Sequence, residues 1–92
     1  MNVKRERLQV IFDILRAIQD KNGKIKPTHI MYKANLSYTM LDEYLKELAG
    51  KGFITSEETK EGKFFSLSQK GFDYIHKYKY VIDFAVSFGL SE

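Results

Sequence analysis

Apolar residues recur at steps of three and four along the first half of the chain, a spacing typical of amphipathic helices. The first run predicts a helix over residues 3–21, with one apolar face formed by Leu8, Ile11, Phe12, Leu15 and Ile18. A second, shorter helix is predicted over residues 27–34, because Pro27, the only proline, suits the first turn of a helix. Asn35 provides its end.

A third helix is predicted directly afterwards. Ser37 stands where an N-cap belongs, and Leu41, Leu45 and Leu48 then form one apolar stripe. The helix is expected to end within residues 50–52, since the two glycines there adopt the left-handed C-cap conformation easily. Two helices joined by so short a break are typical of a helix-turn-helix.

The pattern then changes from helical to strand-like. Residues 53–56 and 64–67 are short and rich in β-formers, and the polar residues 57–63 lie between them, which predicts a hairpin with an exposed tip. Residues 24–26 are expected to add a minor strand to this hairpin. Together these elements predict an α+β fold of the winged helix-turn-helix class, with a three-helix core and the hairpin as the wing.

A long last helix is expected after Ser68, which is placed to cap it. Its apolar residues extend nearly all the way round, which is typical of a helix that is buried on several sides. The favoured interpretation is contact with the same helix of a second copy, and a partner protein or a ligand groove is the alternative. The predicted dimer interface consists of Ile75, Tyr78, Val81, Ile82, Ala85 and Phe88.

Length and composition fit this assignment. The chain has 92 residues, 43% of them hydrophobic, and no apolar stretch long enough to span a membrane. It is expected to divide into a winged helix-turn-helix part, residues 1–71, and a dimerisation helix, residues 72–92. The basic residues near the N-terminus are followed by no apolar segment of the secretory type, so a cytoplasmic location is expected.

No residue pattern indicates catalysis or metal binding. The sequence has no cysteine, and its two histidines, His29 and His76, lie far apart without a neighbouring ligand pattern. It also lacks a Gly-rich phosphate loop and a glycine-flanked nucleophile. We therefore expect no enzyme activity, no metal and no cofactor.

The net charge of +3 is unevenly distributed. Residues 1–35 hold 8 basic and 3 acidic side chains, a net charge of +5, whereas residues 36–67 hold 4 and 6, a net charge of −2. Residues 68–92 hold 3 of each sign. The positive field therefore belongs to the first two helices and not to the third helix and the hairpin, which keeps open a protein-binding role for the fold.

Several segments carry a resemblance to a known family, namely residues 29–38, Tyr44 with Leu45 and Leu48, residues 51–54 and residues 65–71. They resemble the small archaeal winged-helix regulators, which include chromatin-type DNA-binding proteins with a C-terminal dimerisation helix. The resemblance implies a homodimer on duplex DNA, with the third helix facing the major groove and the wing along the backbone or in the minor groove. The last helix here is shorter and more apolar than in chromatin-type members, so a different or shorter dimer contact is expected.

The candidate DNA contacts belong to the third helix, the hairpin tip and the start of the helix-turn-helix. They are Ser37, Tyr38, Thr39, Glu43, Lys46, Lys60, Lys63, Lys24, Lys26 and Lys33. The lysines suit phosphates and Glu43 suits a cytosine amino group, although a carboxylate is usually unfavourable against a polyanion. A solvated surface explains the same residues, and Tyr38 alternatively packs against Tyr32, which is itself expected in the core.

These observations favour a transcriptional regulator that binds duplex DNA as a homodimer in the cytoplasm, associated with the nucleoid. The alternatives are a winged-helix module for protein association and a non-specific architectural chromatin protein.

Overall fold

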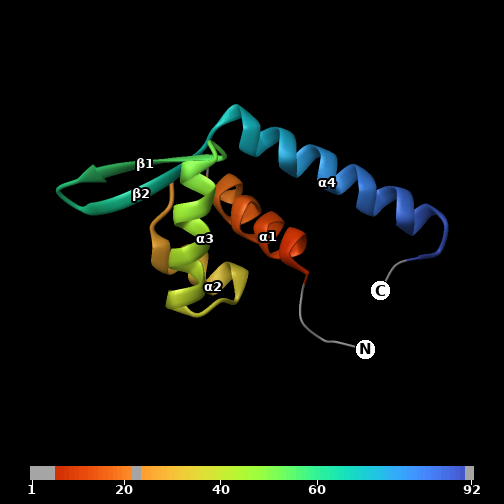
Figure 1. The fold of residues 1–92 in the computed structure, drawn as a ribbon, viewed down its shortest axis with the longest axis horizontal. Helices are drawn as coiled ribbons and strands as arrows, with labels where there is room; N and C mark the ends of the chain where they lie inside the picture. Colours follow the sequence, from red (N-terminus) through yellow and green to blue (C-terminus); the bar gives the residue numbers. More distant parts are fainter. Residues whose placement is uncertain (1–5, 22–23, 91–92) are drawn as a thin grey trace.

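The computed structural model describes residues 6–21 and 24–90. Three helices come first, and they are followed by an antiparallel hairpin and a long last helix (Figure 1). The elements are α1 Arg7–Asp20, α2 Pro27–Ala34, α3 Tyr38–Gly50, β1 Ile54–Thr59, β2 Gly62–Leu67 and α4 Gln69–Ser87. This order confirms the predicted α+β winged helix-turn-helix with a long C-terminal helix. The start of the helix predicted over residues 3–21 lies partly outside the described residues.

The break between α2 and α3 is fixed by local hydrogen bonds. Asn35 adopts the left-handed conformation with φ 56°, and the amide of Leu36 donates to the carbonyl of Met31 at 3.1 Å. This is the arrangement that satisfies the free carbonyls at a helix end. Ser37 then caps α3 as predicted, because its Oγ accepts a hydrogen bond from the amide of Met40 at 3.2 Å.

The third helix ends within residues 50–52 as predicted, with a glycine in the left-handed conformation. Gly52 has φ 83°, and the amide of Phe53 donates to the carbonyl of Leu48 at 2.9 Å. The chain therefore leaves α3 in a fixed direction and enters β1 directly.

The hairpin is longer than the sequence predicted. Its register pairs Ile54 with Leu67 and continues to Thr59 and Gly62, so that only residues 60–61 form the tip. The predicted polar loop over residues 57–63 is therefore wrong in extent, because backbone pairing continues through polar residues. Thr59 stabilises the turn, since its Oγ1 accepts from the amide of Glu61 and donates to the carbonyl of Gly62, both at 3.1 Å.

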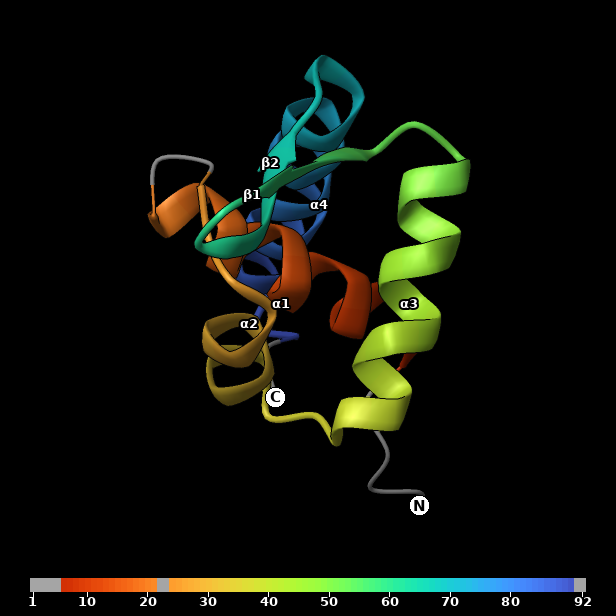
Figure 2. The same ribbon diagram turned by 90° about the vertical axis from the view of Figure 1, so that its left-hand side faces the viewer.

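The core lies where α1, α2, α3 and the base of the hairpin meet, with α1 between the other two helices (Figure 2). Ile25 joins the hairpin as predicted, exchanging two backbone hydrogen bonds with Phe65. The apolar face of α1 is rotated from the predicted one, because Leu8 is 53% exposed. The largest fully buried side chains are Ile14, Leu15, Ile18, Ile25, Ile30, Leu41 and Leu48.

Only the first half of α4 packs on this body. Gly71 and Ile75 are its buried residues, and Tyr78 is half-buried against α1. The second half of α4 projects away from the body on the side opposite the hairpin (Figure 1). Ser68 caps the helix as predicted, accepting a hydrogen bond from the amide of Gly71 at 3.2 Å. Within the described residues, no helix is long and apolar enough to cross a membrane.

Candidate nucleic-acid interface

The outward face of α3 carries the side chains that the sequence placed there. Thr39, Glu43 and Lys46 are exposed, as is Tyr38. Lys46 is not free, because its Nζ lies 3.1 Å from Oδ2 of Asp42 one turn earlier. This exposed pair lowers the net positive charge that Lys46 presents to a ligand.

The outward face of α2 was partly missed by the sequence analysis. Tyr32 is 79% exposed and does not pack in the core, which corrects the prediction made for it. The helical spacing could have predicted this exposure. Tyr32 comes two residues after the buried Ile30, and two residues correspond to a rotation of about 200° around a helix, so the two side chains point in nearly opposite directions. Thr28 and His29 are exposed as well. Lys33 lies on the same helix, but its Nζ is 3.7 Å from Oδ2 of Asp20 on α1.

Two lysines and an aromatic ring form a cluster at the edge of the hairpin. Lys24 and Lys26 lie on either side of the bridged Ile25, and each Nζ is 5.6 Å from the ring centroid of Phe64 on β2. Such cation–π contacts hold the ammonium groups near the ring without removing their charge. Neither lysine has an ion pair in the part of the chain that the structure describes. We call Lys24, Lys26 and Phe64 the edge cluster.

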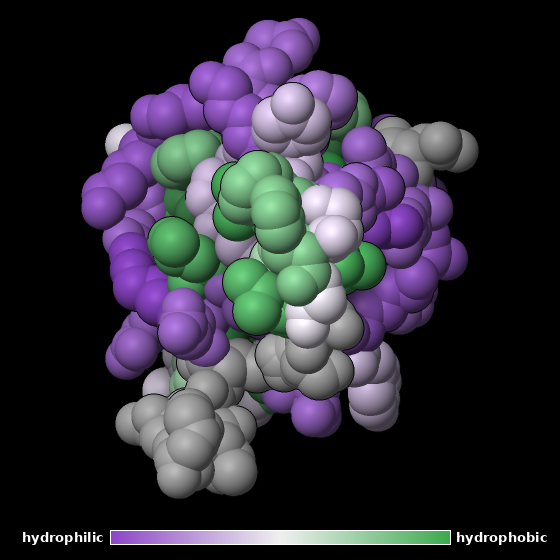
Figure 3. Space-filling view, turned by 90° about the vertical axis from the view of Figure 1, so that its right-hand side faces the viewer, coloured by the Kyte–Doolittle hydropathy of each residue, from purple (hydrophilic) through white to green (hydrophobic). Residues whose placement is uncertain are grey.

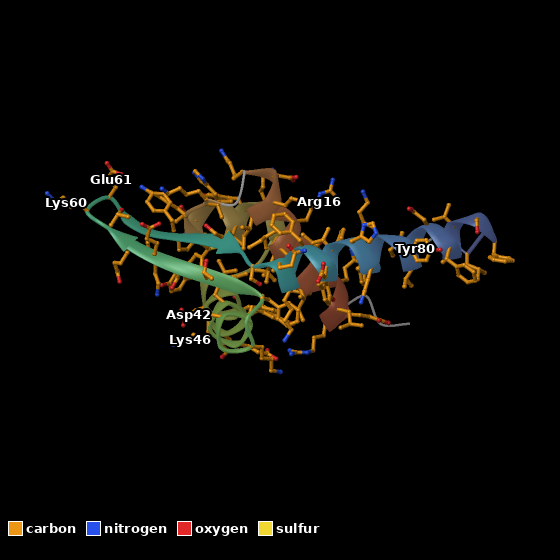
Figure 4. The ribbon with its side chains drawn as sticks, turned by 90° about the horizontal axis from the view of Figure 1, so that it is seen from above. Arg16, Asp42, Lys46, Lys60, Glu61 and Tyr80 are labelled. Carbon is orange, nitrogen blue, oxygen red and sulfur yellow. The ribbon has the colours of Figure 1, made fainter. Side chains whose placement is uncertain are left out.

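The remaining wing lysines lie at the tip and toward α3. Lys60 stands at the far end of the hairpin beside Glu61 (Figure 4). Lys63 points to the α3 side, where a cavity of about 190 Å³ separates α3 from the hairpin. Its lining includes the apolar Leu41, Leu45 and Phe65 and the charged Asp42, Lys46 and Lys63. The fold therefore brings Lys46 and Lys63 to one opening.

The ten predicted contacts thus fall into separate places. Lys46 and Lys63 meet at the cavity between α3 and the hairpin, and Lys24 and Lys26 form the edge cluster. Ser37, Tyr38 and Thr39 stand at the start of α3, where Ser37 already serves as the cap, and Glu43 is exposed further along the same helix. Lys33 forms an ion pair with Asp20 of α1, and Lys60 lies at the tip beside Glu61.

An ion-pair network fixes α3 against the start of α1. Glu47 pairs with Lys51, whose Nζ is 2.9 Å away, and with Arg7 of α1. Lys51 and then Arg7 hold the pKa of the Glu47 carboxyl below its usual value, and Glu47 raises the pKa of Arg7. Glu47 is thereby neutralised within the protein, whereas Glu43 has no ion pair among the described residues.

The sequence model of the winged helix-turn-helix family matches residues 4–85. The chain belongs to this family.

Two similar proteins come from Methanocaldococcus jannaschii. Uncharacterized protein MJ0290 is 37% identical over 70 residues, which are 76% of this chain and 30% of that protein. Uncharacterized protein MJ0287 is 38% identical over 68 residues, which are 74% of this chain and 64% of that protein. The chain spans less than two thirds of the length of either relative.

A solved structure has the arrangement of elements described above. Sso10a-2, a DNA-binding protein from Sulfolobus solfataricus, superposes with a TM-score of 0.80 over 91% of this chain and 85% of that one. The two sequences are 23% identical, so the similarity concerns the fold.

The six residues of the predicted dimer interface differ in how accessible they are in the single chain. Ile75 is only 3% exposed and belongs to the core of its own chain, so it is not available to a second copy. Tyr78 is half-buried because its ring stacks on Phe12 at 4.7 Å. Val81, Ile82 and Phe88 are exposed and Ala85 is half-buried, so these four remain candidates.

Among residues 6–21 and 24–90, no group of three or more His, Cys, Asp or Glu residues is arranged to hold a metal ion.

Proposed function

We propose that this winged-helix protein binds duplex DNA as a homodimer and acts as a transcriptional regulator. The observation that carries the proposal is the placement of lysines without a carboxylate partner in the described part of the chain. Lys24, Lys26, Lys60 and Lys63 all lie on the hairpin or at its edge, beside the exposed face of α3. Lysines so placed would release counterions from the phosphate backbone on binding.

In this proposal α3 enters the major groove and the wing follows the backbone. Thr39 and Lys46 face base edges or phosphates, and Glu43 accepts a hydrogen bond from a cytosine amino group. Tyr38 and Ser37 stand at the N-terminal end of α3, where backbone amides favour a phosphate. The edge cluster anchors the duplex beside the wing.

The dimer of the proposal forms through α4. Val81, Ile82, Ala85 and Phe88 face the same residues of a second copy across a twofold axis, which is the commonest symmetry of soluble oligomers. Two α3 helices would then address half-sites about one helical turn, or a multiple of it, apart. Competitor DNA of another sequence would displace the bound duplex equally well from an architectural chromatin protein. It would displace the duplex less well from a sequence-specific regulator.

One observation favours a second candidate, a winged-helix module that binds another protein. Lys46 is paired with Asp42, and Glu43 is exposed without an ion pair among the described residues. An acidic helix face of this kind suits a basic partner better than a polyanion. Binding of duplex DNA at low salt separates the two candidates.

The test is fluorescence anisotropy of mixed-sequence duplex DNA across a series of salt concentrations. The wild type is expected to bind with an affinity that falls steeply with salt, because each phosphate contact contributes a slope of about −0.9. The double variants Lys24→Gln/Lys26→Gln and Lys46→Gln/Lys63→Gln should each weaken binding and reduce the magnitude of the salt slope by about 2. Lys77→Gln/Lys79→Gln on α4 removes the same number of charges, so it is the matched control and should leave both unchanged.

Equal loss of affinity in the control and in both double variants would show that net charge alone is responsible. Absence of duplex binding by the wild type at low salt would remove the DNA-binding proposal in favour of the protein-binding module. If only Lys24→Gln/Lys26→Gln weakens binding, the edge cluster is the anchor and α3 does not enter the groove.

A further inference from the structure

The projecting half of α4 exposes large apolar side chains around most of its circumference. Figure 3 looks at the end of the molecule where α4 projects, and hydrophobic side chains cover the centre of this face. Tyr80 is 76% and Phe84 65% exposed. The others are Val81, Ile82, Val86, Phe88 and Leu90. A surface this apolar is typical of a helix that is covered by other protein on several sides.

The helical phase of these residues separates two groups. With about 100° per residue and Ala85 as the reference, Val81, Ile82 and Phe88 lie within about 60° of it. They form the seam of the proposed dimer. Phe84 lies about 100° away and Tyr80 about 140° away, both on the side of Phe88. The rings of Phe84 and Phe88 are 5.0 Å apart, so the aromatic row of Tyr80, Phe84 and Phe88 continues outward from the seam.

A two-helix seam leaves the outer part of this row uncovered. A pair of helices in a coiled coil buries a narrow stripe, whereas a helix in a four-helix bundle packs against two neighbours. Tyr80 and Phe84 together expose on the order of 200 to 400 Å² in the single chain. The dimer seam alone offers a few hundred Å² per chain, roughly half of the ~800 Å² per partner that is typical of stable complexes.

Charge on the projecting half does not oppose its association with further copies. Within residues 80–90 the only ionisable side chain that carries a charge at neutral pH is Asp83. It lies about 160° from Ala85, in a polar strip with Ser87. Copies of this helix can therefore meet on two faces without placing like charges opposite each other.

We propose that two dimers join through the aromatic row, so that the projecting halves of four α4 helices form one bundle. The occupant of the surface made by Tyr80 and Phe84 is thus a second dimer of the same chain. This inference rests on the dimer of the proposed function and adds a second interface to it. The resulting tetramer carries four α3 helices, with the bundle at its centre and the wings pointing outward.

The test is the mass of the full chain in solution, measured by light scattering and sedimentation over a range of concentrations. The wild type should reach four chains. Tyr80→Lys/Phe84→Lys should stop at two chains, with the concentration needed for tetramers raised at least tenfold. Both residues are exposed in the single chain, so these changes leave the core intact. Asp83→Lys, about 60° from Tyr80 and 100° from Phe84 on the helix, adds the same charge, so it is the matched control and should still reach four chains.

The outcomes separate the two interfaces. A wild type of two chains at every concentration overturns the tetramer and leaves the dimer standing, whereas a wild type of one chain overturns the dimer of the proposed function as well. A wild type of four chains that Tyr80→Lys/Phe84→Lys does not dissociate overturns the assignment of the aromatic row. Ala85→Lys, at the centre of the dimer seam, should yield single chains.

Discussion

Gly71 shows how one residue fixes the position of α4. A Cβ at this position would lie 2.4 Å from the carbonyl oxygen of Phe53 and 3.1 Å from Cδ2 of Leu67. The same junction is tied by Ser68, whose amide donates to the carbonyl of Phe53 at 3.1 Å and whose Oγ donates to the carbonyl of Gly52 at 2.5 Å. The start of α4 therefore rests directly on the backbone that joins α3 to β1.

Replacing Gly71 by alanine should destabilise the protein. The added methyl group has no space beside a backbone carbonyl, so α4 must shift, and overpacking of this kind costs about 1 to 3 kcal/mol. Urea unfolding measures the change. Gly50→Ala is the control, because nothing beyond its chain neighbours and its own helix backbone lies within 4 Å of the added Cβ and alanine favours a helix by up to about 1 kcal/mol. A Gly71→Ala protein as stable as the wild type would show that the junction is not tightly packed.

At the scale of elements, α4 is held on α1 by a column of aromatic rings. The ring centroids of Phe12 and Tyr78 are 4.7 Å apart, those of Tyr74 and Tyr78 5.9 Å, and those of Phe53 and Tyr74 5.9 Å. The hydroxyl of Tyr74 also donates to the carbonyl of Leu8 at 2.7 Å. This contact joins the first turn of α1 to the second turn of α4, so the docked half of α4 depends on it.

Stability should fall at alkaline pH because of this column. Burial raises the pKa of Tyr74 to about 12 in the folded protein, above the value of about 10 for an unfolded chain. The stability that neutral Tyr74 contributes to the folded protein is therefore fully present below about pH 10 and is lost as the pH rises to about 12. Tyr74→Phe should lose less stability over this interval than the wild type, although burial also raises the pKa of Tyr78.

Chemical unfolding at neutral pH and at several alkaline values measures this difference. Tyr32→Phe is the control, since Tyr32 is exposed and should leave the pH dependence of the wild type unchanged. An identical alkaline loss in Tyr74→Phe and in the wild type would exclude Tyr74 as its source.

The elements that the sequence predicted well are those decided by neighbouring residues. Ser37 and Ser68 cap their helices, and Asn35 ends α2, because each acts on backbone groups within a few positions. The extent of the hairpin was not predictable in this way, since pairing through Glu57 and Glu58 depends on the partner strand. The edge cluster was likewise seen only as separate lysines, because Phe64 comes from a distant strand.

At the scale of the whole molecule, the two candidate binding surfaces lie at opposite ends. It measures 49 × 28 × 21 Å, and the long dimension arises because the hairpin and the projecting half of α4 extend in opposite directions (Figure 1). The lysines of the wing and its edge are at one end, and the apolar surface of α4 is at the other. Occupation of one surface by DNA therefore does not block association through the other.

Association should make the thermal stability of the wild type depend on its concentration. A helix of the length of the projecting half is marginal on its own in water, so its order is coupled to contact with other copies. For a dimer whose chains unfold as they dissociate, the midpoint should rise by roughly 3 °C for each tenfold increase in concentration. Circular dichroism over a hundredfold concentration range measures it.

Ala85→Lys separates this effect from the stability of the body. The variant should unfold at one temperature at every concentration, because the body of a single chain retains its core of α1, α2, α3 and the hairpin. A wild type whose midpoint is equally independent of concentration would mean that the apolar half of α4 is not ordered by a second copy. In that case both the dimer and the tetramer lose their energetic basis, and the exposed surface of α4 must be stabilised by a different protein.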